Sequence, residues 1–130
     1  MQVLIAMPRG ALALMVLALT AVTSAATANP SASIGAQTFA QCRACHTLTQ
    51  GGKSGLGPNL HGVFGRKAGS LPGFAYSPAL KGSGMVWDAR TLDAYLASPT
   101  AQVPGTRMVV KVTDPARRAA LIAYLKVETK

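Results

Sequence analysis

The sequence predicts an all-α protein with few helices and long loops. Three segments place apolar residues at the three- and four-residue spacing of amphipathic helices, and no segment keeps the alternation of a strand for long. Ten of the 13 glycines fall between Thr47 and Met85, where they favour irregular chain. We therefore expect helices joined by loops, and no sheet.

Caps and spacing define three helices. The first is expected over residues 33–45, with the serine at its start as N-cap. The second follows Asp88 and stops at residues 98–99, and the third follows the N-cap Asp114 with Pro115 in its first position. Their apolar stripes consist of Phe39 and Cys42, of Leu92, Tyr95 and Leu96, and of Leu121, Tyr124 and Leu125.

The N-terminal segment has the form of a secretory signal. Arg9 is its one cation, and an uncharged, largely apolar run follows it. Ala26-Thr27-Ala28 fits the small-x-small pattern that signal peptidases cleave. We interpret residues 1–28 as a signal peptide and residues 29–130 as one exported domain. A retained anchor is the alternative, although about 20 strongly apolar residues are needed to span a bilayer.

The exported domain is small and strongly basic. Without residues 1–28 and their single cation, the chain has 102 residues and a net charge of +8. A chain of this length buries only a modest core by itself. Its two cysteines are three positions apart, so a disulfide between them would close too short a loop to add much stability. We therefore expect a bound group to complete the core.

The motif Cys42-x-x-Cys45-His46 indicates what that group is, because C-x-x-C-H is the attachment signature of c-type haem. On a helical turn, residues i and i+3 share a face, so both thiols can add to the two vinyl groups on one porphyrin edge. His46 can then bind the iron. A thioredoxin-like pair lacks a βαβ pattern here, and a zinc site would have only His61 as a further histidine.

Nearly the whole exported chain, from Gly35 to Lys126, resembles the small class I cytochromes c of mitochondria and bacteria. The resemblance implies the cytochrome c fold, an all-α fold in which few helices and long loops wrap around one covalently bound haem c. It also implies that the terminal helices cross, at Gly35, Phe39, Tyr124 and Leu125. The motifs that carry it, in order, are the haem-attachment motif, GPNLHGVFGRKAG over 57–69, PGFAYS over 72–77, Trp87, YLASP over 95–99, PGTRM over 104–108 and LIAYLK over 121–126.

The sixth iron ligand is either a soft neutral donor or a second histidine on chemical grounds. Met108 follows Pro-Gly-Thr-Arg and matches the ligand of the family. We assign Met85 to packing, and His61 matches a position that is not a ligand. The resemblance therefore implies iron ligation by His46 and Met108.

Other positions match residues that surround the haem in the family. Pro58 is expected to accept a hydrogen bond from the His46 ring and so fix its ligating tautomer. Tyr76 and Trp87 match residues that bond a haem propionate, and Arg66 matches one that offsets its charge. With the polar neighbours of the methionine, the expected cofactor-binding set is Cys42, Cys45, His46, Pro58, Arg66, Tyr76, Trp87, Tyr95, Thr106 and Met108.

The sequence departs from the mitochondrial pattern at two positions beside the haem. Leu80 replaces an asparagine, and Val110 replaces a phenylalanine over the haem edge, so we expect a drier pocket at the first and a more open one at the second. Several lysine positions around the haem edge are uncharged here, namely Gln41, Gly55, Thr100 and Ala101. The cations that remain for docking are Arg43, Lys53, Arg107 and Lys111.

The function implied by the resemblance is that of a periplasmic one-electron carrier, and no enzyme. It would shuttle electrons from a donor complex or dehydrogenase to a terminal oxidase or reaction centre. The expected partners are redox proteins with acidic docking surfaces, in transient contact with membrane complexes, and no nucleic acid. The chain itself is expected to be a monomer. The alternative is a haem enzyme or ligand sensor whose sixth ligand is displaceable.

Overall fold

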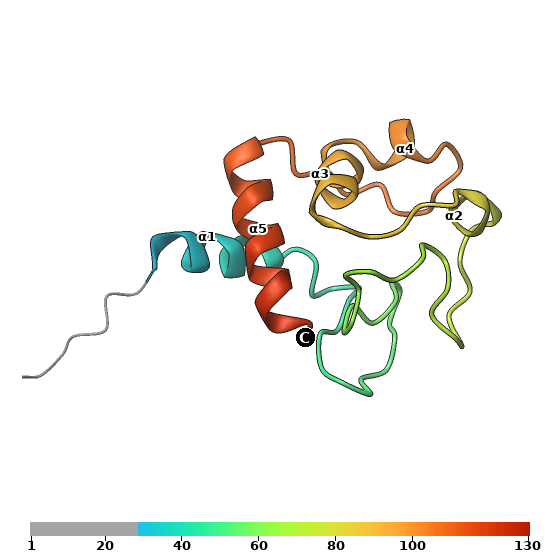
Figure 1. Cartoon of the computed structure of the whole chain (residues 1–130), viewed down its shortest axis with the longest axis horizontal. Coiled ribbons are helices and arrows are strands. Elements are labelled where there is room, and N and C mark those ends of the chain that lie inside the picture. The colour runs from blue at the N-terminus through green and yellow to red at the C-terminus, as the bar shows by residue number, and fades with distance from the viewer. Residues whose placement is uncertain (1–28) are drawn as a thin grey trace, which may run out of the picture.

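The computed structural model describes residues 29–130 as five helices joined by long loops, and the signal peptide expected over residues 1–28 lies outside the described residues. Residues 29–130 form no strand beyond one antiparallel bridge between Lys67 and Val86, so the all-α prediction is confirmed. The helices are α1 (Pro30–Phe39), α2 (Pro78–Gly82), α3 (Ala89–Ala97), α4 (Pro99–Gln102) and α5 (Pro115–Glu128) (Figure 1).

Helix α1 begins and ends earlier than the sequence suggested. Its N-cap is Asn29, whose side chain accepts a backbone N–H at 3.0 Å, and Pro30 follows in the first turn, where its missing N–H is harmless. The prediction that Ser33 caps this helix is wrong, because its hydroxyl donates to the Pro30 carbonyl at 2.8 Å from within the helix. After Phe39 the chain continues in tight turns through the cysteine motif.

Helices α3 and α5 begin where the sequence predicted. Asp88 accepts the Thr91 N–H at 2.7 Å while the Thr91 hydroxyl accepts the Asp88 N–H at 2.8 Å, which forms a complete capping box. Asp114 caps α5 through two backbone N–H groups, at 2.8 and 3.2 Å, and Pro115 is its first residue. Both caps are confirmed.

The short helices α2 and α4 were not predicted. Each begins with a proline that follows a serine, and the Ser77 hydroxyl accepts the Leu80 N–H at 3.1 Å to cap α2. Helices of one turn carry no apolar periodicity, so only the Ser-Pro pairs could have indicated them. Part of the segment that was expected to be loop is therefore regular structure.

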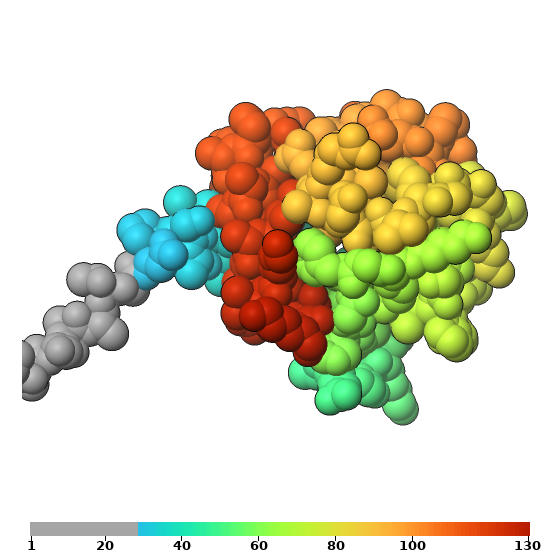
Figure 2. Space-filling view, viewed as in Figure 1, coloured from blue at the N-terminus to red at the C-terminus, as the bar shows by residue number. Residues whose placement is uncertain are grey.

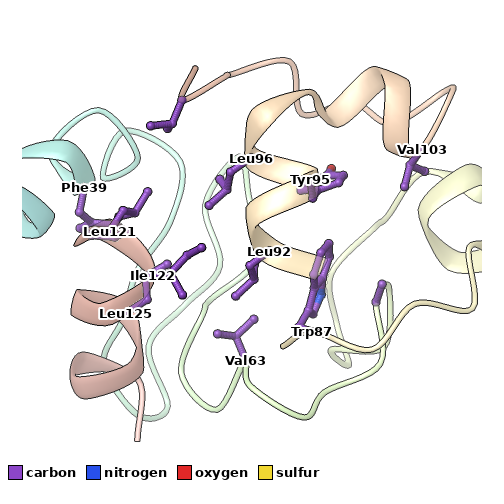
Figure 3. Close-up of a cluster of buried hydrophobic side chains, with 12 residues drawn as sticks. Phe39, Val63, Trp87, Leu92, Tyr95, Leu96, Val103, Leu121, Ile122 and Leu125 are labelled. Atoms are coloured by element: carbon purple, nitrogen blue, oxygen red, sulfur yellow. The ribbon is translucent and has the colours of Figure 1, made fainter. Parts of the chain in front are cut away.

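The terminal helices α1 and α5 cross at close range (Figure 1). Gly35 makes this possible, because a Cβ atom there would lie 2.6 Å from the Cβ of Tyr124 and would press on the Ala120 carbonyl. Beside the crossing, Phe39 is 2% exposed and Leu121 is fully buried (Figure 3). The crossing that the resemblance implied is present in the structure.

Helix α3 supplies the other half of the core. In Figure 3 its Leu92 and Leu96 point towards α5, while Tyr95 lies on the other side near Trp87. The Trp87 and Tyr95 rings meet edge to face with their centroids 5.0 Å apart. The core thus extends from the helix crossing to Val103, the buried residue directly before the 104–108 loop.

The long loops lie on one side of the helical part. Residues 47–75, in green shades in Figure 2, cover the region below α2 and α3 in that view. Gly69 has φ +74°, and a Cβ there would lie 2.7 Å from the Lys81 Cα, so glycine allows this loop to rest on α2. In residues 29–130 no helix has the length and apolar character needed to cross a membrane.

Candidate haem site

The cysteine motif lies on turns that continue from α1. The N–H groups of Cys45 and His46 donate to the Cys42 carbonyl at 3.1 and 2.9 Å, which is the geometry of one helical turn. Residues three apart on such a turn share a face. Both thiols are half-buried and free, and burial, with a smaller effect of Cys45, raises the pKa of Cys42. Two thiols therefore face the same region, as attachment to one porphyrin edge requires.

The loop that follows the motif fixes the orientation of the His46 ring. Its Nδ1 lies 2.7 Å from the Pro58 carbonyl, so Nδ1–H donates there and Nε2 keeps a lone pair for iron. Burial lowers the pKa of His46, and the hydrogen bond to Pro58 raises it by less. The neutral imidazole, which is the form that binds metals, is favoured.

Gly57 gives the His46 ring its space. A Cβ at Gly57 would lie 2.8 Å from both Nδ1 and Nε2 of the imidazole. A hydrogen bond also ties this loop to the cysteine motif, because the Gly57 N–H donates to the Cys45 carbonyl at 2.9 Å. Sequence reasoning missed Gly57, although its place directly before Pro58 was a usable signal.

Asn59 organises the loop around the histidine. This buried side chain donates to the Thr47 hydroxyl at 2.7 Å and to the Thr49 carbonyl at 2.9 Å. Arg66 crosses the same loop, with Nη2 donating to the Asn59 carbonyl and Nη1 to the His61 carbonyl, each at 3.0 Å. Two hydrogen bonds therefore fix the positive charge of Arg66 against this loop. Asn59 is a further residue that sequence reasoning missed.

Tyr76 and Trp87, the two expected propionate neighbours, are each 8% exposed. Burial raises the pKa of the Tyr76 phenol, while a hydrogen bond with the Leu71 backbone and the charge of Arg66 act in the opposite direction. The positive charge of Arg66 therefore acts on the Tyr76 phenol. A neutral phenol beside a cation can donate a hydrogen bond to a carboxylate.

Met108 follows a well-anchored turn. Tyr95 Oη and Thr106 Oγ1 lie 2.6 Å apart in a buried hydrogen bond that links α3 to the residue two positions before Met108. Burial raises the pKa of Tyr95, and the Thr106 hydrogen bond opposes this effect. The thioether of Met108 is half-buried against the core, so a soft neutral donor is held in place.

The residues present fit a haem c. An imidazole with a free Nε2, a thioether and two free thiols are the donors that covalent attachment and axial ligation need. The donors for a zinc site are missing, since residues 29–130 contain no cluster of three or more His, Cys, Asp or Glu side chains. Half-buried apolar side chains beside the core are available to contact a porphyrin, namely Leu48, Leu60, Phe64, Ala79, Leu80, Met85 and Met108.

The two departures from the mitochondrial pattern have different environments. Leu80 packs half-buried against the core and brings no polar atom into the pocket. Val110 is 41% exposed and its neighbour Val109 is 66% exposed, so the chain after Met108 presents apolar side chains to solvent. Directly before Met108, the Arg107 guanidinium donates to the Ala75 carbonyl at 2.9 Å.

Comparison with known proteins identifies similar sequences among bacterial cytochromes. The chain is 52% identical to a cytochrome c2 of Rhodomicrobium vannielii over 92 residues, which cover 70% of this chain and 74% of that protein. It is 42% identical to a cytochrome c2 of Blastochloris viridis over 107 residues, which cover 82% of this chain and 84% of that protein. No family model matches the chain.

A solved structure is similar in both sequence and fold. Cytochrome cH from Methylobacterium extorquens superposes with a TM-score of 0.69 at 47% sequence identity, over 74% of this chain and 97% of that one. Identity at this level over most of a domain relates the two proteins by descent as well as by fold.

Proposed function

The chain belongs to the class I cytochrome c family and is a cytochrome c2-type electron carrier with one covalent haem c, and we propose that His46 and Met108 ligate its iron in the periplasm. The bound haem supplies a reversible one-electron change of its iron. The chain's own residues bind the group, orient its ligands and exclude water. Cys42 and Cys45 are the proposed points of attachment.

The observation that carries this proposal is the anchoring of the Met108 segment. The buried bond between Tyr95 and Thr106, at 2.6 Å, fixes the backbone two residues before Met108. An iron held between two fixed side chains would change oxidation state with little rearrangement, which suits a carrier. His46 is fixed on its side by the carbonyl of Pro58.

A haem enzyme or ligand sensor would instead need an open sixth position and mobile polar groups above it. The two residues that could serve there are His61 and Arg66. Both nitrogen donors of the Arg66 fork already bond backbone carbonyls, at 3.0 Å each. This engagement favours the carrier over the alternative.

Spectroscopy of the ferric holoprotein tests the proposal. We expect a weak near-infrared band from methionine-to-iron ligation and a redox titration that fits a single one-electron step. The Met108→Ala variant should lose the band, whereas the Met85→Ala variant should keep it. A band that survives in Met108→Ala, or is absent from the unmutated protein, would contradict ligation by Met108.

The proposed partners are redox proteins with acidic docking surfaces. Residues 29–87 contain five cations and no acidic residue, so this part of the chain is uniformly basic. Near the motif, Arg43 lies over the Phe39 ring with its guanidinium carbon 5.8 Å from the ring centre. A quinol-oxidising complex or a dehydrogenase is the proposed donor, and a terminal oxidase or reaction centre the proposed acceptor.

Electron transfer to an acidic redox partner should depend moderately on salt. Opposite charges raise association rates, and screening removes the gain. We expect the bimolecular rate constant to fall by about tenfold between low salt and a few tenths molar. Stopped-flow measurements check this. Lys111→Gln should lower the low-salt rate more than Lys126→Gln, because Lys111 is three residues after Met108. Lys126 lies near the other end of α5, roughly 17 Å along the helix from its first residue. Equal rates at all salt concentrations would contradict electrostatic guidance.

A further inference from the structure

We propose that the Asp93–Arg118 ion pair is a positioning element for the sixth ligand, because it holds the segment through which the chain leaves Met108. The inference rests on the proposed ligation by Met108. Arg118 Nε lies 2.8 Å from Asp93 Oδ1, and this is the one ion pair within residues 29–130. The pair joins α5 to α3.

Arg118 also bonds the segment that follows Met108, through its Nη1 nitrogen. Its Nη1 donates to the carbonyls of Val112 and Thr113, at 3.0 and 2.9 Å. The Arg118 side chain is only 11% exposed, so its charge needs these acceptors. Asp93, 47% exposed, fixes the direction of the guanidinium and thereby the place of both carbonyls.

Helix α3 holds both ends of the Met108 segment. Before the methionine, Tyr95 bonds Thr106 at 2.6 Å. After it, the Val112 N–H donates to the Leu96 carbonyl at 2.9 Å, and the Val112 side chain is 5% exposed. Figure 1 shows the chain between α4 and α5 returning past α3. The entry and the exit of the segment are thus fixed to adjacent residues of one helix.

The length of the free segment makes this control effective. Five residues, 107–111, separate the two anchors, and none of them is in regular structure. A chain extends by at most about 3.6 Å per residue, so a fixed Val112 keeps Met108 within roughly 14 Å of it. Releasing Val112 would let the segment swing on its first anchor alone. The thioether would then leave the iron more often.

Competition with imidazole on the ferric holoprotein measures how often Met108 leaves. An added ligand binds in proportion to the population in which the iron is open. Arg118→Met removes the carbonyl bonds and keeps the apolar stem, and we expect it to raise imidazole affinity by about tenfold. Asp93→Ala removes only the partner carboxylate, and we expect about threefold. Asp93→Glu should restore most of the original affinity.

Ala123→Gly is the matched control. Ala123 is an exposed residue of α5, so glycine there lowers helix stability without touching the Met108 segment. We expect it to leave imidazole affinity unchanged while it lowers the unfolding midpoint. As an independent readout, the Val112 amide should exchange its hydrogen faster in Asp93→Ala, but not in Ala123→Gly under native conditions.

The outcomes separate the two proposals. A normal near-infrared methionine band in the unmutated protein, with no gain in imidazole affinity in Arg118→Met, overturns the positioning role and leaves Met108 ligation intact. A gain that merely follows the loss of global stability, and is equal in Ala123→Gly, overturns it too. If the band is missing from the unmutated protein, ligation by Met108 is wrong and the inference falls with it.

Discussion

Gly57→Ala should disrupt the proposed ligation of iron by His46. The new Cβ would lie 2.8 Å from both ring nitrogens, closer than carbon atoms of folded proteins approach such groups. The ring cannot yield without losing its hydrogen bond to the Pro58 carbonyl at 2.7 Å. Overpacking and the lost hydrogen bond together should lower the free energy of unfolding by about 2–4 kcal/mol. Denaturant unfolding of the ferric holoprotein measures the loss of stability, and the haem spectrum of the folded protein reports the change in ligation.

Two reference variants isolate the steric cause. Gly82→Ala adds the same methyl group where no atom lies within 4 Å, so it should leave both stability and spectrum nearly unchanged. Pro58→Ala keeps the backbone carbonyl that His46 bonds, so its effect should be smaller than that of Gly57→Ala. A Gly57→Ala protein with the spectrum and stability of the Gly82→Ala variant would show that the space beside the ring is not limiting.

That the protein carries one covalent haem c was predictable from the sequence. The motif of Cys42, Cys45 and His46 indicates this cofactor by its spacing, because attachment needs two thiols on one face and an adjacent imidazole. The caps Asp88 and Asp114 were also readable, since side chains that bond the first N–H groups act locally. In each case the interaction joins residues that are close in the chain.

The rest depends on contacts between distant residues. Asn29 rather than Ser33 caps α1, because the Asn-Pro pair offers a better start four residues earlier. The Arg118–Asp93 pair spans 25 positions, and nothing local in the sequence selects that acid among the four available. Arg107 likewise bonds a carbonyl 32 positions away. Such pairs become visible only when the fold brings the helices and loops together.

At the crossing of the terminal helices, Gly35→Ala should lower stability although it improves helix propensity. Alanine in a helix interior is favoured over glycine by about 1 kcal/mol. Against this, its Cβ would lie 2.6 Å from the Tyr124 Cβ and would press on the Ala120 carbonyl, which belongs to the backbone of α5 and cannot rotate away. Overpacking of this kind costs about 1–3 kcal/mol, and more where a rigid backbone must move.

We therefore expect Gly35→Ala to reduce the free energy of unfolding by about 1–3 kcal/mol, and Gly35→Val to reduce it further, because a β-branched side chain places more atoms at the same contact. Guanidinium unfolding of the holoprotein checks both, with an unchanged slope showing that the two states keep their compactness. The near-infrared methionine band should persist, since the crossing and the Tyr95 ring lie on opposite sides of α3 (Figure 3) and Tyr95 is the residue that bonds Thr106. If Gly35→Ala instead stabilised the protein, propensity would outweigh packing and α1 and α5 would have room to separate.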